Sequence, residues 1–238
     1  MLTTRRRANR YRDLLLLSGG LALACVALSL AVPQGCVVLL PIALVLFLCA
    51  VFYLLPRYES WSSGAEGEEQ VVAVLSSLPG CYVLHDIVLP GQRGNIDHIV
   101  VAPSGVCVVE TKNYTGTIRC VDDSWERLRG RGRRATFMRM ERDPGAQARR
   151  NAVMLSEYIY SRLRLDLWIG AIICFPHPRC ELVVCSSTTR IARLDGLRDA
   201  ILDQRSSRGL SLEEMTRVWH ALEGGGAARG GGGHVWID

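Results

Sequence analysis

The sequence predicts an α/β domain, built as a mixed sheet flanked by helices, that is preceded by two transmembrane helices. Two apolar runs near the N-terminus contain no charged residue. From residue 57 onward, segments typical of helices and strands follow in the order helix, strands, helix, strand, which is typical of layered α/β domains. The 238 residues suffice for one domain core in addition to the two apolar runs.

The two apolar runs have the length of membrane-spanning helices. Residues 14–32 and 36–55 extend for 19 and 20 positions without a charge, close to the roughly 20 residues that a helix needs to cross a hydrocarbon core of ~30 Å. The connector 33–35 is short and uncharged, which favours a tight hairpin. The alternative is a signal peptide, because residues 29–31 resemble a cleavage site. The second run, which follows at once, favours the hairpin.

The flanks of the hairpin predict its orientation. The connector carries no charge, Arg57 follows the second run, and five arginines precede the first: Arg5, Arg6, Arg7, Arg10 and Arg12. The positive-inside rule therefore predicts that both ends are cytoplasmic, in the plasma (inner) membrane. Gly19 and Gly20 leave open a homo-oligomer formed through the spans. The runs lack the charged residues that mark transport pathways.

The chain divides into four predicted regions. These are a basic N-terminus at 1–13, the transmembrane hairpin at 14–56, the α/β domain at 57–222 and a glycine-rich flexible tail at 223–238. Periodicity and capping residues predict helices at 64–78, 144–163, 196–203 and 211–222. Runs rich in Val, Ile and Cys predict strands at 81–89, 95–102, 105–111, 117–121, 168–175, 182–185 and 189–192.

Charge and cysteine spacing exclude two simple interpretations. Of the 28 basic and 23 acidic residues, five arginines and Asp13 precede or abut the spans, so 23 basic and 22 acidic residues remain. Net charge therefore does not indicate a nucleic-acid partner. The nine cysteines form no CxxC pair and no Cys/His cluster at zinc spacing, which argues against a structural zinc. We expect buried free thiols in a reducing compartment.

Residues 127–142, RLRGRGRRATFMRMER, are locally basic, with seven arginines and one acid. We predict a glycine-containing loop that could hold a phosphate backbone. The expected contacts are Arg129, Arg131, Arg133 and Arg134. The alternatives are a solvated insertion and a contact with the anionic inner leaflet of the membrane.

The segment APSG at 102–105 predicts a turn between two strands. If the loop has two residues, Asp97 lies directly opposite Glu110. Two like charges in such facing positions destabilise a sheet, and a divalent cation between them would reverse that effect. A three-residue loop with a bulge at Gly105 would instead bring Thr111 opposite Asp97. The sequence leaves both registers open.

Lys112 is the one lysine among 28 basic residues. Because Glu110 and Lys112 are two residues apart, they project from the same face of one strand. Paired carboxylates suit Mg²⁺ or Mn²⁺, which also bind phosphate oxygens. The compact ammonium of lysine can orient or deprotonate an attacking water, whereas arginine stays protonated and presents a planar fork.

The spacing of Asp97, Glu110 and Lys112 resembles the D…ExK core of the PD-(D/E)xK nuclease superfamily. The words GAEGEE, LHDIVLP, GNIDHIVVAPSGVCVVETKNYTG and DPGAQ resemble more closely the nuclease-related domain (NERD) family, over about residues 58–200. The resemblance implies a restriction-endonuclease-type core in which Asp97 and Glu110 hold the metal. It also implies that Thr111 adds its backbone carbonyl, and that Lys112 serves the water.

The resemblance extends to two further polar residues. Glu68, in the GxxGE of the first helix, would be an additional acid at the metal or its waters. Gln147 stands where related domains often carry a polar helix residue near the site, although Asp143-Pro144 replaces the expected Asn-Pro. His98 would point to the opposite face of the sheet from Asp97, so we interpret it, with His85 and Asp86, as structural.

Two functions of different class follow. The first is a membrane-anchored nuclease that uses Mg²⁺ or Mn²⁺ to hydrolyse phosphodiester bonds of DNA or RNA at the cytoplasmic face. The second is a catalytically silent module that binds nucleic acid or a protein partner at the membrane. The acid pair and the sole lysine favour the nuclease.

Overall fold

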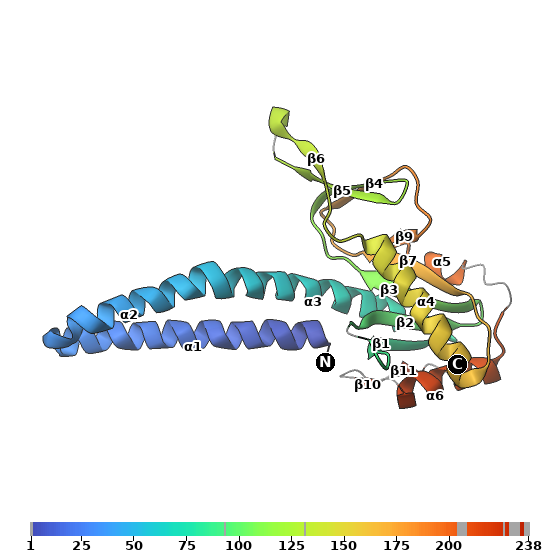
Figure 1. Cartoon of the computed structure of the whole chain (residues 1–238), viewed down its shortest axis with the longest axis horizontal. Coiled ribbons are helices and arrows are strands. Elements are labelled where there is room, and N and C mark those ends of the chain that lie inside the picture. Colours follow the sequence, from blue (N-terminus) through green and yellow to red (C-terminus); the bar gives the residue numbers. More distant parts are fainter. Residues whose placement is uncertain are drawn as a thin grey trace. The chain divides into compact units, whose positions relative to one another are not determined.

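The computed structural model describes residues 2–92, 94–130, 132–203, 209–225, 227–228 and 234–235 (Figure 1). The chain separates into two compact units, residues 1–65 and 66–238. Each unit is described below by itself. Arg131, one of the arginines expected to contact nucleic acid, lies outside the described residues, as does most of the 229–238 part of the predicted tail.

The first unit is a helical hairpin. Helix α1 (Thr3–Ala31) is followed by a 3-10 turn, η1 (Pro33–Gly35), then α2 (Cys36–Cys49), a π-helical segment η2 (Ala50–Leu54) and the start of α3 (Leu55–Leu75). The Ser18 hydroxyl donates to the Leu46 carbonyl at 3.0 Å, and the Arg7 guanidinium lies 4.6 Å from the centre of the Trp61 ring. The first contact joins the middle of α1 to α2, and the second joins the beginning of α1 to α3.

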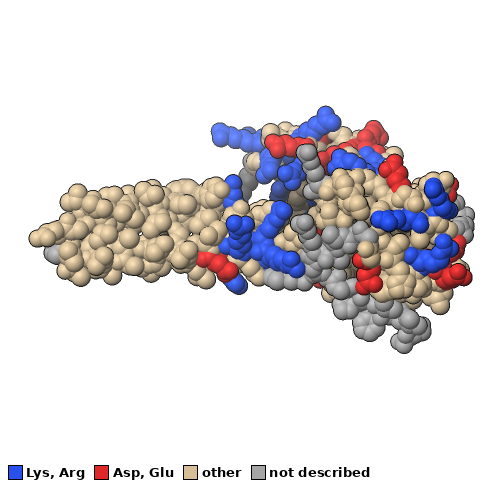
Figure 2. All heavy atoms as spheres, turned by 60° about the horizontal axis from the view of Figure 1, so that its bottom comes forward, with Lys and Arg blue, Asp and Glu red and all other residues tan. Residues whose placement is uncertain are grey.

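The hairpin has the composition of membrane-spanning helices. The helix Thr3–Ala31 and the continuous helical stretch Cys36–Leu75 are both long and apolar enough to cross a membrane. Figure 2 shows the visible surface of this hairpin as uncharged along most of its length, with charged side chains at its base. Pro41 lies inside α2, where a membrane helix tolerates proline.

The second unit is a mixed α/β domain, which confirms the predicted fold class. Its larger sheet has the order β10-β1-β2-β3-β7-β9, and β11 also pairs with β1. Strand β2 pairs antiparallel with both β1 and β3, whereas β3, β7 and β9 are parallel. The bounds are β1 Tyr82–Val88, β2 Ile96–Ala102, β3 Gly105–Thr111, β7 Ile169–Phe175, β9 Arg190–Arg193, β10 Ala227–Ala228 and β11 His234–Val235.

A second, smaller sheet corrects the prediction of a basic loop at 127–142. Its order is β6-β5-β4-β8, with β4 and β8 parallel. The bounds are β4 Gly116–Val121, β5 Ser124–Arg129, β6 Thr136–Arg139 and β8 Cys180–Val184. The arginine-rich stretch therefore forms strands rather than a loop, with a 3-10 turn η3 (Gly132–Arg134) between β5 and β6. The sequence did not reveal β5 as a strand because only its Trp125 is buried. Exposed or half-buried polar residues occupy most of its other positions.

Helices cover both faces of the larger sheet. Helices α4 (Pro144–Leu163) and α6 (Leu212–Gly225) pack on one face, where Leu155, Ile159 and Val218 form a core with side chains of β2 and β3. On the other face, α3 and α5 (Leu197–Leu202) enclose a second core around Leu75 and Cys107. Figure 1 shows α4 lying across the central strands of the sheet.

A third core, around Trp125 and Phe175, joins the smaller sheet to β7. The tip of the β4–β5 hairpin is also fixed to the rest of the domain. The Asp123 carboxylate accepts hydrogen bonds from the Ser187 hydroxyl at 3.0 Å and the Thr188 amide at 2.9 Å. Arg149 of α4 donates to the Thr189 hydroxyl at 2.6 Å. The loop after β8 therefore links the smaller sheet to α4.

The predicted tail, 223–238, contains structure where it is described. Helix α6 extends to Gly225, and Ala227–Ala228 and His234–Val235 pair antiparallel with β1. The cysteines of the domain are free, and Cys81, Cys107, Cys120, Cys174 and Cys180 are buried, in keeping with the expected small apolar role.

Candidate active site

The candidate site lies where β2 begins and β3 ends. His98 pairs with Val109 and Ala102 pairs with Gly105, so the connecting loop contains only Pro103 and Ser104. The two-residue loop is thus confirmed and the bulged alternative is excluded. Continuing this register by one residue sets Asp97 directly opposite Glu110.

Hydrogen bonds connect the two acids to the residues that follow Glu110. The Thr111 amide donates to Asp97 Oδ2 at 2.9 Å. Lys112 Nζ donates to Glu110 Oε1 at 2.5 Å, and the Lys112 amide donates to the Cys174 carbonyl of β7 at 2.9 Å. The end of β3 is therefore held on both sides, which fixes the direction in which Lys112 leaves the strand.

Helix α4 supplies two amide side chains from one face. Lys112 Nζ donates to Gln147 Oε1 at 3.2 Å, and Asn151 Nδ2 donates to Glu110 Oε2 at 3.2 Å. Residues four apart lie on the same side of a helix, so one docked helix positions both. Gln147 was a sequence candidate. Asn151 was missed, and the signal that could have found it is its spacing of four from Gln147.

Burial and charge determine the protonation of the cluster. Glu110 is 2% exposed and Glu68 is 8% exposed. Burial, reinforced by the charges of Glu110 and Glu68, raises the pKa of Asp97 well above its ordinary value. Burial alone would lower the pKa of Lys112, but the carboxylates of Glu110 and Asp97 outweigh it and raise that pKa. The site therefore holds an ammonium among crowded carboxyl groups.

Gly67 brings α3 against the end of β3. A Cβ atom at Gly67 would lie 2.5 Å from Cβ of Asn113, the residue after Lys112, which is too close for any side chain. The next helix residue, Glu68, is buried and its charge acts on Asp97. The glycine of the GxxGE motif thus permits the close approach that brings Glu68 to the acid pair.

A buried histidine pair lies on the opposite face of β2. His85 Nδ1 and His98 Nδ1 are 2.9 Å apart, and His98 Nε2 is 3.1 Å from Thr111 Oγ1. Burial, with a smaller effect from His85, lowers the pKa of His98 well below its ordinary value. Asp86 accepts a hydrogen bond from Asn95 Nδ2 at 2.7 Å. His98 therefore contacts Thr111, whereas Asp86 contacts the segment before β2.

The donor set is compatible with a hard divalent cation. Among the described residues, no group of three or more His, Cys, Asp or Glu side chains is arranged to hold a metal ion. Mg²⁺ usually binds one or two carboxylates and fills its other positions with water and substrate phosphates, so a larger protein cage is not required. Asp97 and Glu110 provide two facing carboxyl groups, the number that Mg²⁺ usually binds. A bound cation would also reduce the repulsion between their charges.

The described arginines that were predicted to contact nucleic acid do not bond to this cluster. Arg129 ends β5, and Arg133 and Arg134 are exposed in the turn η3. Within the described part of the chain, none of the three forms an ion pair or a side-chain hydrogen bond with the acid–lysine cluster. The structure therefore does not bring them together with Asp97, Glu110 or Lys112.

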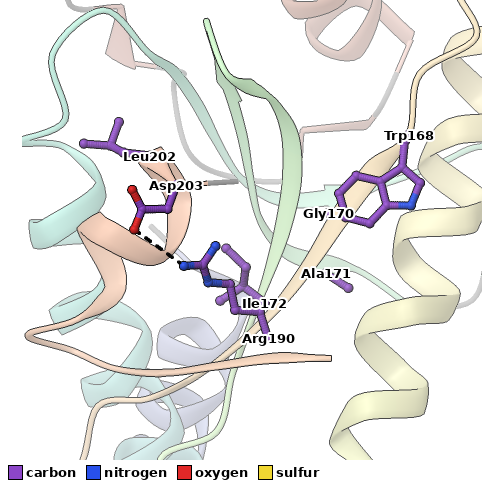
Figure 3. A pocket seen from close by; sticks show the side chains of 7 residues that line it. All are labelled: Trp168, Gly170, Ala171, Ile172, Arg190, Leu202 and Asp203. Atoms are coloured by element: carbon purple, nitrogen blue, oxygen red, sulfur yellow. Dashed lines mark ion pairs between the residues drawn. The ribbon is translucent and has the colours of Figure 1, made fainter. Parts of the chain in front are cut away.

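One large cavity lies outside the acid–lysine cluster. It has a volume of about 760 Å³ and opens beside the first residues of β7, between Trp168 and the end of α5 (Figure 3). Its arginine, Arg190, forms an ion pair with Asp203 at 3.8 Å. None of the predicted site residues lines it, so size alone does not identify a catalytic centre in this domain.

Comparison with known proteins assigns a family to this region. Residues 63–176 match the family described as the nuclease-related domain, NERD. A curated protein of Bacillus anthracis, described as uncharacterized, is 48% identical over 60 residues, which cover 23% of this chain and 28% of that protein. The match thus spans little more than a quarter of this relative. No solved structure gives a significant match.

Proposed function

We propose that the protein is a membrane-anchored, metal-dependent nuclease, from the premise that residues 63–176 match the nuclease-related domain family. It would hydrolyse phosphodiester bonds of DNA or RNA at the cytoplasmic face. The observation that carries the proposal is the position of the Lys112 ammonium, held between Glu110 Oε1 and Gln147 Oε1 with Asp97 facing the same acid.

Asp97 and Glu110 are the residues proposed to hold Mg²⁺ or Mn²⁺, with the Thr111 carbonyl as a further oxygen ligand. Glu68 is proposed to contact the ion or its waters. When bound, such an ion lowers the pKa of a coordinated water and neutralises charge on a phosphate. The positive charge also relieves the repulsion between carboxyl groups that share a buried space.

Lys112 is proposed to orient the attacking water and to donate a hydrogen bond to the phosphate. Its raised pKa keeps the ammonium protonated, which favours orientation over proton abstraction in the metal-free site. Arginine could not replace it in the same way, because a planar fork does not fit between two acceptors that each take one hydrogen bond.

Gln147 and Asn151 are proposed to act as positioning residues. Gln147 accepts a hydrogen bond from Lys112, and Asn151 donates one to Glu110. Each amide therefore fixes one member of the acid–lysine pair in place before substrate arrives. Positioning of this kind lowers the cost of bringing reacting groups together.

The helical hairpin is proposed to anchor the domain to the plasma (inner) membrane. Both helical stretches are long and apolar enough to cross it, and the arginines before the first run favour a cytoplasmic N-terminus and domain. Protease digestion of inside-out and right-side-out vesicles tests this arrangement. The proposal expects the domain to be cleaved only in inside-out vesicles, and cleavage in right-side-out vesicles alone would contradict it.

A cleavage assay on the full-length protein in detergent tests the enzymatic proposal. Plasmid and single-stranded DNA and RNA are incubated with Mg²⁺ or Mn²⁺, beside Lys112→Ala and Asp97→Ala. The exposed Asp199 of α5 provides the matched control, Asp199→Ala. Metal-dependent cutting that only the two site variants lose supports the nuclease. No cutting at all would favour the catalytically silent binding module. Cutting that survives both substitutions would show that Asp97 and Lys112 do not form the active site.

A further inference from the structure

A second cavity, here called the hairpin cavity, is lined by residues that lie close in sequence to those of the candidate site. It has a volume of about 490 Å³ and lies against the β5–β6 hairpin. Four arginines contribute to its lining: Arg127, Arg129, Arg139 and Arg142. Tyr114, Met138 and Met140 supply apolar surface, and Glu141 is the one carboxylate among the described lining residues.

Both borders of the hairpin cavity connect to the candidate site. On one side, Tyr114 follows Lys112 by two residues, and the Tyr114 amide donates to the Lys112 carbonyl at 2.8 Å. On the other side, Arg142 precedes Asp143, which caps α4 by accepting from the Ala146 amide at 2.9 Å. Gln147, the partner of Lys112, lies one turn further along α4. The chain therefore runs directly from the lining of the cavity to the acid–lysine cluster on both sides, within two residues at Tyr114 and within five at Arg142.

The arginines of the cavity differ in how they are held. Arg127 donates to the Thr115 carbonyl at 2.7 Å and lies 5.8 Å from the centre of the Tyr114 ring, so it braces the wall. Within the described residues, Arg129, Arg139 and Arg142 make no side-chain hydrogen bond or ion pair. Three guanidinium groups are thus available to an anion, and guanidinium binds phosphate through paired hydrogen bonds.

The combination of apolar and cationic surface indicates the form of the ligand. Tyr114 is held by Phe175, with ring centres 6.2 Å apart, and Met138 is 56% exposed. An unpaired nucleotide presents a flat base that stacks on such surfaces and phosphates that reach the arginines. A duplex keeps its bases stacked inside and offers mainly phosphates and base edges, which would leave the apolar surface without a partner.

We propose that the hairpin cavity binds an unpaired nucleotide of a single-stranded nucleic acid. The base packs on Tyr114 and Met138, and Arg129, Arg139 and Arg142 hold the adjoining phosphates. This binding leads the strand to Lys112, so the role in substrate delivery depends on the proposed nuclease function, whereas the binding itself does not.

Binding without cleavage tests the inference. Fluorescence anisotropy of labelled DNA and RNA oligonucleotides, single-stranded and duplex, is measured with full-length protein in detergent and EDTA. We expect Tyr114→Ala to weaken single-strand binding by about 5- to 150-fold, and Tyr114→Phe to preserve it. In Arg129→Ala/Arg142→Ala, the dependence of log K on log salt should fall by about 0.7 for each arginine.

A matched double variant controls for net charge. Arg162→Ala/Arg217→Ala removes two arginines near the other end of α4, where Arg217 donates to the Leu163 carbonyl at 3.5 Å. It should bind single strands as the wild type does. Tyr114→Leu keeps apolar volume if alanine at this position reduces stability. Reduced binding by Tyr114→Leu with an unchanged melting temperature supports stacking.

Two results would overturn the inference. The first is unchanged single-strand binding in the tyrosine and cavity arginine variants. The second is duplex binding that is equally tight and equally dependent on Tyr114. The nuclease proposal is tested separately. If the protein binds single strands through the cavity but never cuts them, the cavity is supported and the nuclease function is contradicted. If metal-dependent cutting is unchanged in the cavity variants, the nuclease function is supported and the role of the cavity is contradicted.

Discussion

Replacing Asp97 with asparagine should stabilise the metal-free protein while removing its activity. The asparagine Oδ1 can still accept the hydrogen bond that the Thr111 amide donates to Asp97 at 2.9 Å. The substitution removes the negative charge that faces Glu110 and lies within the influence of Glu68. It keeps shape and hydrogen bonding and changes only the electrostatics of the acid pair.

The gain can be estimated from the sheet geometry. Like charges in facing positions of an antiparallel pair cost up to about 1 kcal/mol, and Asp97 also experiences the charge of Glu68. A change of 1 kcal/mol shifts the melting temperature of a domain of this size by about 2–4 °C. We therefore expect Asp97→Asn to melt about 2–4 °C higher than the wild type at neutral pH.

The difference should depend on pH. Burial and neighbouring carboxylates raise the pKa of Asp97 in the folded protein. At pH values between the ordinary carboxyl pKa and this raised pKa, Asp97 is therefore protonated in the folded wild type and ionised in the unfolded chain. Its stability falls as pH rises from the ordinary carboxyl range through the raised pKa. Asp97→Asn lacks this loss. The difference in melting temperature between Asp97→Asn and the wild type should reach its full size at pH values above the raised pKa. It should vanish at pH values below the ordinary pKa of aspartate.

Differential scanning fluorimetry on full-length protein in detergent and EDTA measures both effects. The wild type and Asp97→Asn are compared at neutral pH and at acidic pH, and cleavage is measured separately with Mg²⁺. The electrostatic reasoning would be refuted if Asp97→Asn melted at a lower temperature than the wild type at neutral pH and the difference were the same at acidic pH. Retained cleavage would refute the role of Asp97 in the site.

Three further substitutions test separate parts of the structure. Lys112→Arg should lower cleavage by about 10²- to 10⁴-fold with little change in melting temperature, measured on one preparation by gel assay and fluorimetry. Gly67→Ala should cost about 1–3 kcal/mol, since its Cβ overlaps a packed asparagine. Its control Gly64→Ala, with open space around it, should gain about 0.5–1 kcal/mol in urea unfolding. Asp123→Ala should speed hydrogen exchange in the loop 186–189. Burial alone would raise the pKa of Asp123, but hydrogen bonds from that loop outweigh it and lower the pKa. Its stabilising effect is therefore present above the ordinary pKa and lost as pH falls through the lowered one.

The sequence predicted the elements whose ends carry specific chemistry. Helix α4 was expected at 144–163 and is observed at Pro144–Leu163, because Asp143 caps its first turn and proline fits its first position. The turn at Pro103 and Ser104 was also expected, but the sequence left two registers open, and the structure has the one that faces Asp97 with Glu110. Local backbone preferences therefore predicted the helix bounds and the turn, but not the register.

The smaller sheet could not be predicted in the same way. Its strand β5 buries only Trp125 and otherwise alternates exposed or half-exposed polar side chains, so periodicity gives no apolar face to recognise. Its pairing with β4 and the docking of Trp125 on Phe175 are long-range contacts. The arginine-rich stretch 127–142 was therefore predicted to be a loop, although its pairing in the sheet gives it the strands β5 and β6.

The candidate site was predictable in its acids and lysine, and less so in its amides. Glu110 and Lys112 are neighbours on one strand, so spacing alone places them on one face. Asn151 reaches Glu110 only because α4 docks across β3, and its spacing of four from Gln147 is the one local signal of this contact. The role of Gly67 was hidden for the same reason, since its contact with Asn113 joins a helix and a strand far apart in sequence.

The most direct measurement of the central claim is the rate at which the full-length protein cuts a labelled single-stranded oligonucleotide, with Mg²⁺ and with EDTA, beside Glu110→Gln. Glutamine keeps the size of Glu110 and its one oxygen can still accept from Lys112. Its NH2 group replaces the oxygen that accepts from Asn151, and the substitution removes the charge proposed to hold the metal. We predict that the wild type cleaves the oligonucleotide with Mg²⁺ but not with EDTA, and that Glu110→Gln cleaves it in neither condition. Equal cleavage by the wild type and Glu110→Gln, or cleavage that persists in EDTA, would contradict the account.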